Sequence, residues 1–438
     1  MDIIIITAVA LLGLYMAWNI GANDVANSMA DAVGSKAISI KQAVILAGIC
    51  EFSGAVLVGS HVTDTVRKGI VDPSLLASMP NITAPDAATM LVIGMTAALL
   101  SAAFWLHFSS WTGMPVSTTH SIVGAVAGFG IVAAGWESVN WGKMSQIVAS
   151  WFISPVAGGL MAYVLFRFIS KYILERDKPA RAAIKFAPVV VFMMAAVLTL
   201  GTIYKGLKHV IKDIPWFTDD LALVLSLTIA LACAIVSHII IRKKLAGKEE
   251  LPISKQLNYV EQIFTPIVII SSCAVAFAHG ANDVANSVGP LAAVVHVIST
   301  GTIEMKVGVP FWILMLGGTG IVIGLATYGY RVMHTVGTDI TEITPSRGVA
   351  ADIAATAVVL ICTRMKLPVS TTHTLVGAIL GIGLARGLGG VNRAVTKKIF
   401  GSWIITVPAA AILAMILYQA GNFFLFDIIK SIILANGA

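Results

Sequence analysis

The sequence predicts an all-α polytopic membrane protein with about twelve transmembrane helices, an inverted repeat, and broken helices or hairpins. Of its 438 residues, 57% are hydrophobic and only 12% are charged, and the mean hydropathy is +0.89. Soluble globular chains carry about 25% charged residues. The octapeptide GANDVANS occurs twice, at 21–28 and at 280–287. Internal duplication inside apolar sequence is typical of transporters built from two related halves.

Twelve apolar stretches are long enough to cross a bilayer, which takes roughly 20 residues. In order they are 3–34, 40–60, 87–108, 115–135, 144–170, 186–205, 221–241, 259–298, 309–330, 348–364, 367–388 and 399–419. The last apolar stretch, 422–436, is short for a span and suits the membrane interface. The stretches 115–135 and 367–388 allow a second interpretation, in which each is part of a re-entrant hairpin.

Positive charge predicts the orientation of the chain. The most basic connections are 171–185, 242–255 and 386–398. With twelve crossings, all three fall on the cytoplasmic side when the N-terminus lies outside, as the positive-inside rule requires. We therefore expect a multi-pass protein of the cell (plasma or inner) membrane. The net charge of +7 lies in these short loops, so it reports topology and indicates no nucleic-acid partner.

The repeat is broader than the octapeptide. PVSTTHSIVGAVAGFG at 115–130 and PVSTTHTLVGAILGIG at 368–383 are identical at eleven of sixteen positions and follow GANDVANS in the same order. Seven crossings separate the two GANDVANS helices, so we expect them to run in opposite directions. The predicted organisation is a first inverted repeat at 1–170, a linker with two transmembrane helices and basic cytoplasmic loops at 171–258, and a second inverted repeat at 259–438.

GANDVANS has the chemistry of a cation site. On a helix its carboxylate, amide and hydroxyl groups share one face, and their oxygens suit a hard cation such as sodium. A carboxylate inside a membrane is costly and marks a functional site by default. The alternative is an Asn/Asp network that joins helices. The predicted sodium ligands are Asn23, Asp24, Asn27, Asn282, Asp283 and Asn286.

Two glycines begin the octapeptides. Gly21 and Gly280 are expected to let each helix break there, which would free backbone carbonyl oxygens for the ion. A third membrane acid, Glu51, lies within the stretch 40–60. It is either a possible relay for protons or ions, or a buried hydrogen-bonded partner.

PVSTTH has the chemistry of an anion site. Proline favours the first turn of a helix, where backbone amides have no intrahelical partner, and a helix N-terminus attracts an oxyanion. The alternative is ordinary Ser/Thr capping. The candidate phosphate-binding hydroxyls are those of Ser117, Thr118, Thr119, Ser370, Thr371 and Thr372.

The residues after these hydroxyls have simpler predicted roles. His120 and His373 lack partners at metal-ligand spacing, and we expect them to make structural hydrogen bonds. The GxxxG pairs that follow, Gly124/Gly128 and Gly377/Gly381, are expected to let helices pack closely.

The two motifs, each present twice and in the same order, resemble the inorganic phosphate transporter (PiT) family over essentially the whole chain. The resemblance implies a homodimeric symporter of phosphate with sodium or protons. It also implies that phosphate binds near Asp24, Asp283, Ser117–Thr119 and Ser370–Thr372, with cations beside it. The family includes sulfate permeases and proton-coupled carriers of phosphate or metal–phosphate, which remain alternatives.

The resulting hypothesis is a secondary active symporter that imports inorganic phosphate with sodium ions by alternating access. Cations at the two aspartates would cancel their repulsion of the anion, which explains why both ligands travel together. No cofactor is expected besides sodium as co-substrate, and the chain is not expected to be an enzyme. An anion channel is a less favoured alternative, and a membrane hydrolase that uses His120 or His373 lacks a nucleophile or metal set.

Overall fold

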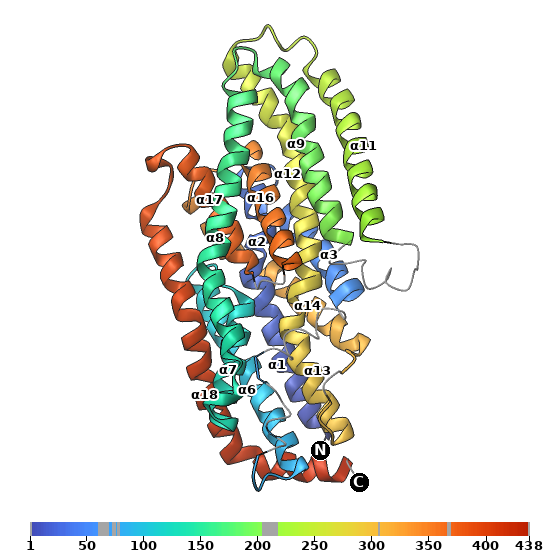
Figure 1. Ribbon diagram of the computed structural model, residues 1–438, viewed down its shortest axis with the longest axis vertical. Coiled ribbons are helices and arrows are strands. Elements are labelled where there is room, and N and C mark those ends of the chain that lie inside the picture. The colour runs from blue at the N-terminus through green and yellow to red at the C-terminus, as the bar shows by residue number, and fades with distance from the viewer. Residues whose placement is uncertain are drawn as a thin grey trace.

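The computed structural model describes residues 2–59, 70–71, 76, 79–203, 218–304, 307–365 and 369–436. These residues are almost entirely helical, and the only strand-like pairing among them is an isolated bridge between Val71 and Val139. Figure 1 shows an elongated bundle in which the N- and C-termini lie together at one end.

The helices follow the predicted segments. The first predicted repeat contains α1 (Asp2–Asp24), α2 (Ala26–Gly34), α3 (Ile40–Val58), α6 (Ala84–Trp111), α7 (Thr118–Ala134), η2 (Trp136–Ser138), α8 (Trp141–Ile169) and η3 (Ser170–Leu174). The linker contains α9 (Pro179–Gly201) and α11 (Asp219–Leu245). The second predicted repeat contains α12 (Ile253–Asp283), α13 (Ala285–Thr300), α14 (Phe311–Thr327), α15 (Tyr330–His334), η5 (Thr335–Asp339), α16 (Pro345–Arg364), α17 (Thr371–Ala385), η6 (Leu388–Gly390) and α18 (Arg393–Asn436).

The number of spans is lower than twelve in the described part of the chain. Nine of its helices are long and apolar enough to cross a membrane, or ten if the bent pair 311–327 and 330–339 counts as one span. The predicted spans at 115–135 and 367–388 are not among these helices, because α7 has 17 residues and α17 has 15. Both helices are too short for a bilayer that takes roughly 20 residues. The fold class is confirmed, whereas the count of twelve is not.

The C-terminal stretch 422–436 continues α18 without interruption to Asn436. In Figure 1 this end of α18 turns across the end of the bundle that holds both termini. The Asn436 amide donates hydrogen bonds to the Asp2 carboxylate and to the Ile298 carbonyl oxygen, both at 2.8 Å. The stretch therefore ties the C-terminus to α1 and α13.

Helices that carry matching motifs run in opposite directions. In Figure 1, α1 starts at the end that holds the termini, and α12 starts at the opposite end. The basic connections 171–185 and 242–255 both lie at the latter end, and 386–398 lies toward the same side.

The two predicted repeats interlock rather than stand side by side. α1 packs on α14 and α12 packs on α3, while α7 packs on α18 and α17 packs on α8. The GxxxG pairs lie at these contacts: a Cβ at Gly124 or Gly128 would overlap the backbone of α18, and one at Gly377 or Gly381 would overlap that of α8. The prediction that these glycines allow close packing is confirmed.

The predicted helix breaks at Gly21 and Gly280 are wrong. Both helices continue to the aspartate three residues later, and the interruptions fall at Val25 and Val284. The glycines instead let backbones touch, since a Cβ at Gly21 would collide with the Ile321 carbonyl and one at Gly280 with the Glu51 carbonyl. Close approach between helices, and not flexibility, explains these two positions.

Gly280→Ala should therefore destabilise the protein. The added methyl group would overlap the Glu51 backbone, and overpacking of this kind costs about 1–3 kcal/mol. Gly401→Ala on α18 is the matched control, because nothing lies within 4 Å of its added Cβ and the helix gains up to about 1 kcal/mol. Denaturant titration in detergent measures both, and equal stability of the two variants would contradict the packing argument.

Candidate functional site

The two GANDVANS segments form matching one-residue interruptions of long helices. α1 ends at Asp24 and α2 begins at Ala26, while α12 ends at Asp283 and α13 begins at Ala285. Helix geometry resumes at once, since the Ser287 amide donates to the Val284 carbonyl at 3.1 Å. Each aspartate thus lies at the end of one helix, next to an asparagine in the first turn of the following helix.

Three acidic side chains meet at these interruptions. Asp24, Asp283 and Glu51 are each at most 2% exposed. The His279 ring lies between them, with Nε2 at 2.8 Å from Asp283 and 3.3 Å from Asp24, and with Nδ1 at 3.5 Å from Glu51. Asp24, His279 and Asp283 offer ligand atoms within 4.8 Å of one another, which is close enough to share one metal ion.

His279 is the site residue that the sequence reasoning missed. It immediately precedes the second octapeptide and lies one helical turn before Asp283. Side chains four residues apart share a helix face, so this spacing was a signal that pointed to the contact. Glu51 was singled out correctly as a membrane acid, and its contacts are with His279 and with the Ser28 hydroxyl at 3.2 Å.

The site is asymmetric. His279 corresponds to Ile20, the residue immediately before the first octapeptide, and Glu51 corresponds to Ile321 in the matching part of α14. Both isoleucines are fully buried. Where α12 crosses α3, the contact between Gly280 and the neighbouring backbone lies beside the ionisable pair His279 and Glu51. Where α1 crosses α14, the matching contact of Gly21 lies beside the apolar pair Ile20 and Ile321.

Each octapeptide contacts the PVSTTH motif of the opposite half. The Asn27 amide donates to the Thr372 hydroxyl at 2.8 Å. The Asn286 amide lies 3.3 Å from the hydroxyls of both Thr118 and Thr119. The same amides reach back to the carboxylates of Asp24 and Asp283, at 3.3 and 3.5 Å respectively. Asparagine thus joins the acidic cluster to the helix starts.

The PVSTTH serines cap their helices. The Ser117 hydroxyl accepts from the His120 amide and the Ser370 hydroxyl from the His373 amide, both at 3.2 Å. The first intrahelical hydrogen bonds of α7 and α17 are donated by the backbone amides of Ser121 and Thr374. The amides before these two residues therefore have no backbone acceptor within their helix. Capping and anion binding are compatible here, because the caps leave the threonine hydroxyls and the first amides at the buried helix starts.

The first asparagine of each octapeptide has a different environment. Asn23 holds the connection between α6 and α7, accepting from the Val116 amide and donating to the Ser110 hydroxyl and the Met114 carbonyl, all at 3.1 Å. The Asn282 amide bonds to the Asp283 carboxylate at 3.0 Å. Asn23 therefore positions the start of α7 near the acidic cluster.

The motif histidines make contacts between rings. The rings of His120 and His373 meet edge to face with their centroids 5.0 Å apart, and His373 stacks on Trp403 at 3.8 Å. Nδ1 of His120 and both ring nitrogens of His373 are buried without a hydrogen-bond partner among the described residues. The hydrogen-bond expectation is therefore wrong for His373 within the described part of the chain, and the pair joins the two halves through aromatic packing.

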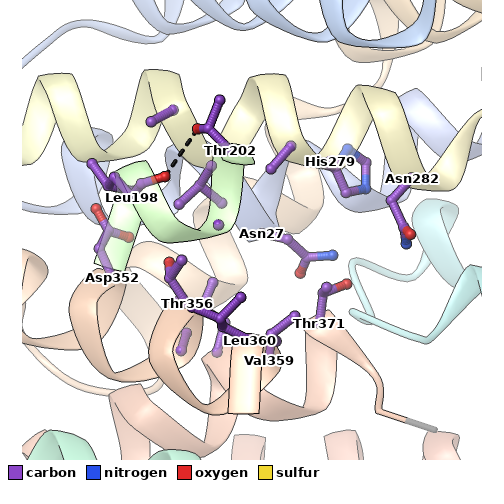
Figure 2. Close-up of a pocket in the computed structure, with 16 residues that line it drawn as sticks. Asn27, Leu198, Thr202, His279, Asn282, Asp352, Thr356, Val359, Leu360 and Thr371 are labelled. Carbon is purple, nitrogen blue, oxygen red and sulfur yellow. Dashed lines mark hydrogen bonds between the residues drawn. The ribbon is translucent and has the colours of Figure 1, made fainter. Parts of the chain in front are cut away.

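A pocket opens beside the cluster (Figure 2). It lies between the end of α9, α12, α16 and the start of α17, and its empty volume is about 790 Å³ including open space at its mouth. Asn27, His279, Asn282 and Thr371 line one part of it, and Asp352 lines another. His279, the partner of the acidic cluster, and Thr371 at the start of α17 thus line one cavity.

Comparison with known proteins identifies the family. The model of the phosphate transporter family matches residues 20–414. The chain belongs to the phosphate transporter family. A protein of Pyrococcus abyssi named as a phosphate permease is 46% identical over 409 residues, which cover 93% of this chain and 96% of the relative. Inorganic phosphate transporter 2-1, chloroplastic, of Arabidopsis thaliana is 40% identical over 93% of this chain and 71% of its own length.

A solved structure gives the same result. It is described as the sodium-dependent phosphate transporter, and it superposes with a TM-score of 0.82 at 41% identity, covering 96% of this chain and 100% of the other. The resemblance drawn from the repeated motifs is confirmed. This phosphate transporter is a multi-pass membrane protein and not an enzyme, and its substrate is phosphate.

The contact between Asn27 and Thr372 should couple the two halves of the transporter. In a double-mutant cycle of Asn27→Ala and Thr372→Val, we expect an interaction energy of about 0.5–1.5 kcal/mol, the usual net value of one hydrogen bond. Asn27→Ala with Thr119→Val is the control and should be additive, because Thr119 contacts Asn286. Unfolding in detergent measures both cycles, and an additive first cycle would show that the contact contributes nothing.

Proposed function

We propose that this phosphate transporter is a secondary active symporter that imports phosphate together with sodium ions by alternating access. The observation that carries the proposal is the buried meeting of Asp24, Glu51 and Asp283 beside the starts of α7 and α17. A carboxylate cluster attracts cations, and a pair of helix N-termini attracts an anion.

The charge of the cluster gives a reason for coupling. Three ionised carboxylates with one protonated His279 carry a net charge of −2 in a site shielded from water. Adding a phosphate dianion to that charge is strongly unfavourable at low dielectric. Two sodium ions would neutralise the carboxylates, and phosphate would then bind only after sodium. Phosphate is therefore not tolerated in the site without sodium.

The proposed sodium ligands are the carboxylates of Asp24 and Asp283 with the side-chain oxygens of Asn27 and Asn286. Their proximity at the two interruptions supports this assignment. Asn23 and Asn282 remain expected ligands from the motif, although the oxygen of Asn23 already accepts from the Val116 amide. The description of the similar solved structure as sodium-dependent also favours sodium over protons.

The proposed phosphate site lies between the starts of α7 and α17, at the hydroxyls of 117–119 and 370–372. Thr118 and Thr372 are almost fully buried, and each contacts an asparagine of the opposite octapeptide. A phosphate held there would touch both halves of the protein. Movement of one half against the other would then expose it to alternate sides.

The opposite directions of α1 and α12 and the exchanged packing of α7 and α17 support an inverted repeat. The clustering of the basic connections at the end opposite the termini supports an N-terminus outside the cell membrane. The homodimer stays an expectation from the family resemblance.

Asp24→Asn and Asp283→Asn should each reduce sodium-driven phosphate uptake to about a hundredth or less, because loss of one partner of a buried ion pair costs about 3–5 kcal/mol. Asp427→Asn, on the exposed face of α18, is the control and should transport normally. Radiolabelled phosphate uptake into proteoliposomes measures all three, with sodium and proton gradients imposed separately.

Several outcomes of that assay contradict the proposal. Equal accumulation with a proton gradient alone would assign proton coupling, and competition by sulfate at equal concentration would assign a broader anion permease. Failure to accumulate phosphate against its gradient would indicate a channel.

Thr118→Val and Thr372→Val should weaken phosphate binding without abolishing sodium binding. Each removes a hydroxyl from the helix starts, and a hydrogen bond to a charged group contributes about 1.5–3 kcal/mol, so the apparent affinity should fall by about 10- to 100-fold. Thr228→Val, on α11 of the linker, is the control. Binding of labelled phosphate at saturating sodium measures the effect, and unchanged affinity in both motif variants would place the anion elsewhere.

A further inference from the structure

A second pair of acids lies outside the proposed sodium and phosphate residues. Asp31 on α2 and Asp352 on α16 are 1% and 3% exposed, and their carboxyl groups are within hydrogen-bonding contact of each other. α12 contributes two hydroxyls, since Ser271 and Ser272 both donate to Asp352. Asp31 lies one helical turn beyond Asn27 on the same helix.

This pair lacks a compensating charge. None of the salt bridges found among the described residues involves either acid, and both Asp31 oxygens are buried without a donor from that part of the chain. Two carboxylates that share a buried site cannot both stay ionised without a bound cation. The arrangement therefore points to an occupant that supplies one positive charge.

The surrounding helices do not supply that charge. Ionisable groups on the elements packed against α2 and α16 have other partners. The acids contact other residues: Glu51 contacts Ser28 and His279, Glu261 contacts Ser346, and Asp339 contacts His334. The basic groups do so too: Arg347 contacts Glu342, Arg167 contacts Glu175, Arg331 lies over the Tyr328 ring, Lys185 lies over the Phe186 ring, and His373 stacks on the Trp403 ring.

A proton fits this pair better than a metal ion. The two carboxyl groups are within hydrogen-bonding contact, and α2 and α16 approach closely there, since a Cβ added at Gly348 would lie 3.2 Å from the Asp31 Cβ. A hard metal ion such as calcium takes about 6–8 oxygen ligands, whereas the described residues show only the two carboxyl groups and the hydroxyls of Ser271 and Ser272 at this place. The position matching Asp31 in the second octapeptide repeat is Pro290, so this acid is not required by the shared packing of the two halves.

We propose that Asp31 and Asp352 hold one exchangeable proton between their carboxyl oxygens, at an ionic site separate from Asp24 and Asp283. When the proton leaves to water, both groups become carboxylates and repel, which favours separation of α2 from α16. The pocket that Asp352 lines also reaches Asn27, so it offers a path for the proton (Figure 2). The protonation state of the pair thereby changes the position of α2, the helix that carries Asn27.

Infrared spectroscopy tests proton binding without requiring transport. At neutral pH, the difference spectrum between the wild type and Asp31→Asn/Asp352→Asn should contain the C=O band of one protonated carboxyl group. The band should vanish on alkaline titration, and Asp427→Asn should leave it unchanged. A difference spectrum with only ionised carboxylate bands would overturn the proposal. Removal of the C=O band by sodium at constant pH would also overturn it, because the site would then hold a metal ion.

A transport measurement tests the coupling to α2, and this part rests on the proposed function. With the sodium gradient fixed, the ratio of wild-type to Asp31→Asn uptake should fall about tenfold for each pH unit on the alkaline side, as expected for one proton. The ratio cancels the titration of phosphate itself. Asp352→Asn should give the same pH dependence, so a folding defect in one variant does not remove the test. A ratio independent of pH, in variants that still transport, would contradict the coupling.

Discussion

Buried negative charge at the crossing of α1, α3 and α12 is the constraint on which the rest of the structure depends. Three carboxylates in nearly complete isolation from water are tolerable only if neighbouring groups and bound ions offset their charge. His279 supplies one ionisable partner, and asparagine amides from both octapeptides supply hydrogen bonds. The helix interruptions bring these groups together, because each places an aspartate and an asparagine at adjoining helix ends.

Interlocked packing brings the proposed anion site to this charge. α7 is held by α18 and α17 by α8, with glycines that allow backbone contact, so the starts of α7 and α17 are fixed relative to the opposite halves. Asn23 fixes the connection that precedes α7. The proposed cation and anion sites are consequently not independent of each other. A shift of either half must change distances in both sites at once, which is the geometric requirement for coupled transport.

Sequence reasoning reached the fold class, the family and the motif residues because strong apolar runs and exact repeats report on them directly. It did not reach the positions of the interruptions, since a glycine that permits close packing and one that permits a break look alike in a sequence. His279 was missed because it lies just outside the repeated octapeptide. The exchange of partners between Asn27 and Thr372 depends on packing between segments 345 residues apart, which no local pattern encodes.

The difference between the two crossings has an energetic consequence. In an inverted repeat with identical halves, the inward-open and outward-open states would be related by a two-fold rotation in the membrane plane and would have equal free energy. Here one crossing buries His279 and Glu51, and the other buries Ile20 and Ile321. Opening at the first crossing hydrates charged groups, whereas opening at the second exposes hydrocarbon, and these processes differ in free energy. Under the proposed alternating access, the empty transporter would therefore have a preferred resting orientation, which two identical halves would not provide.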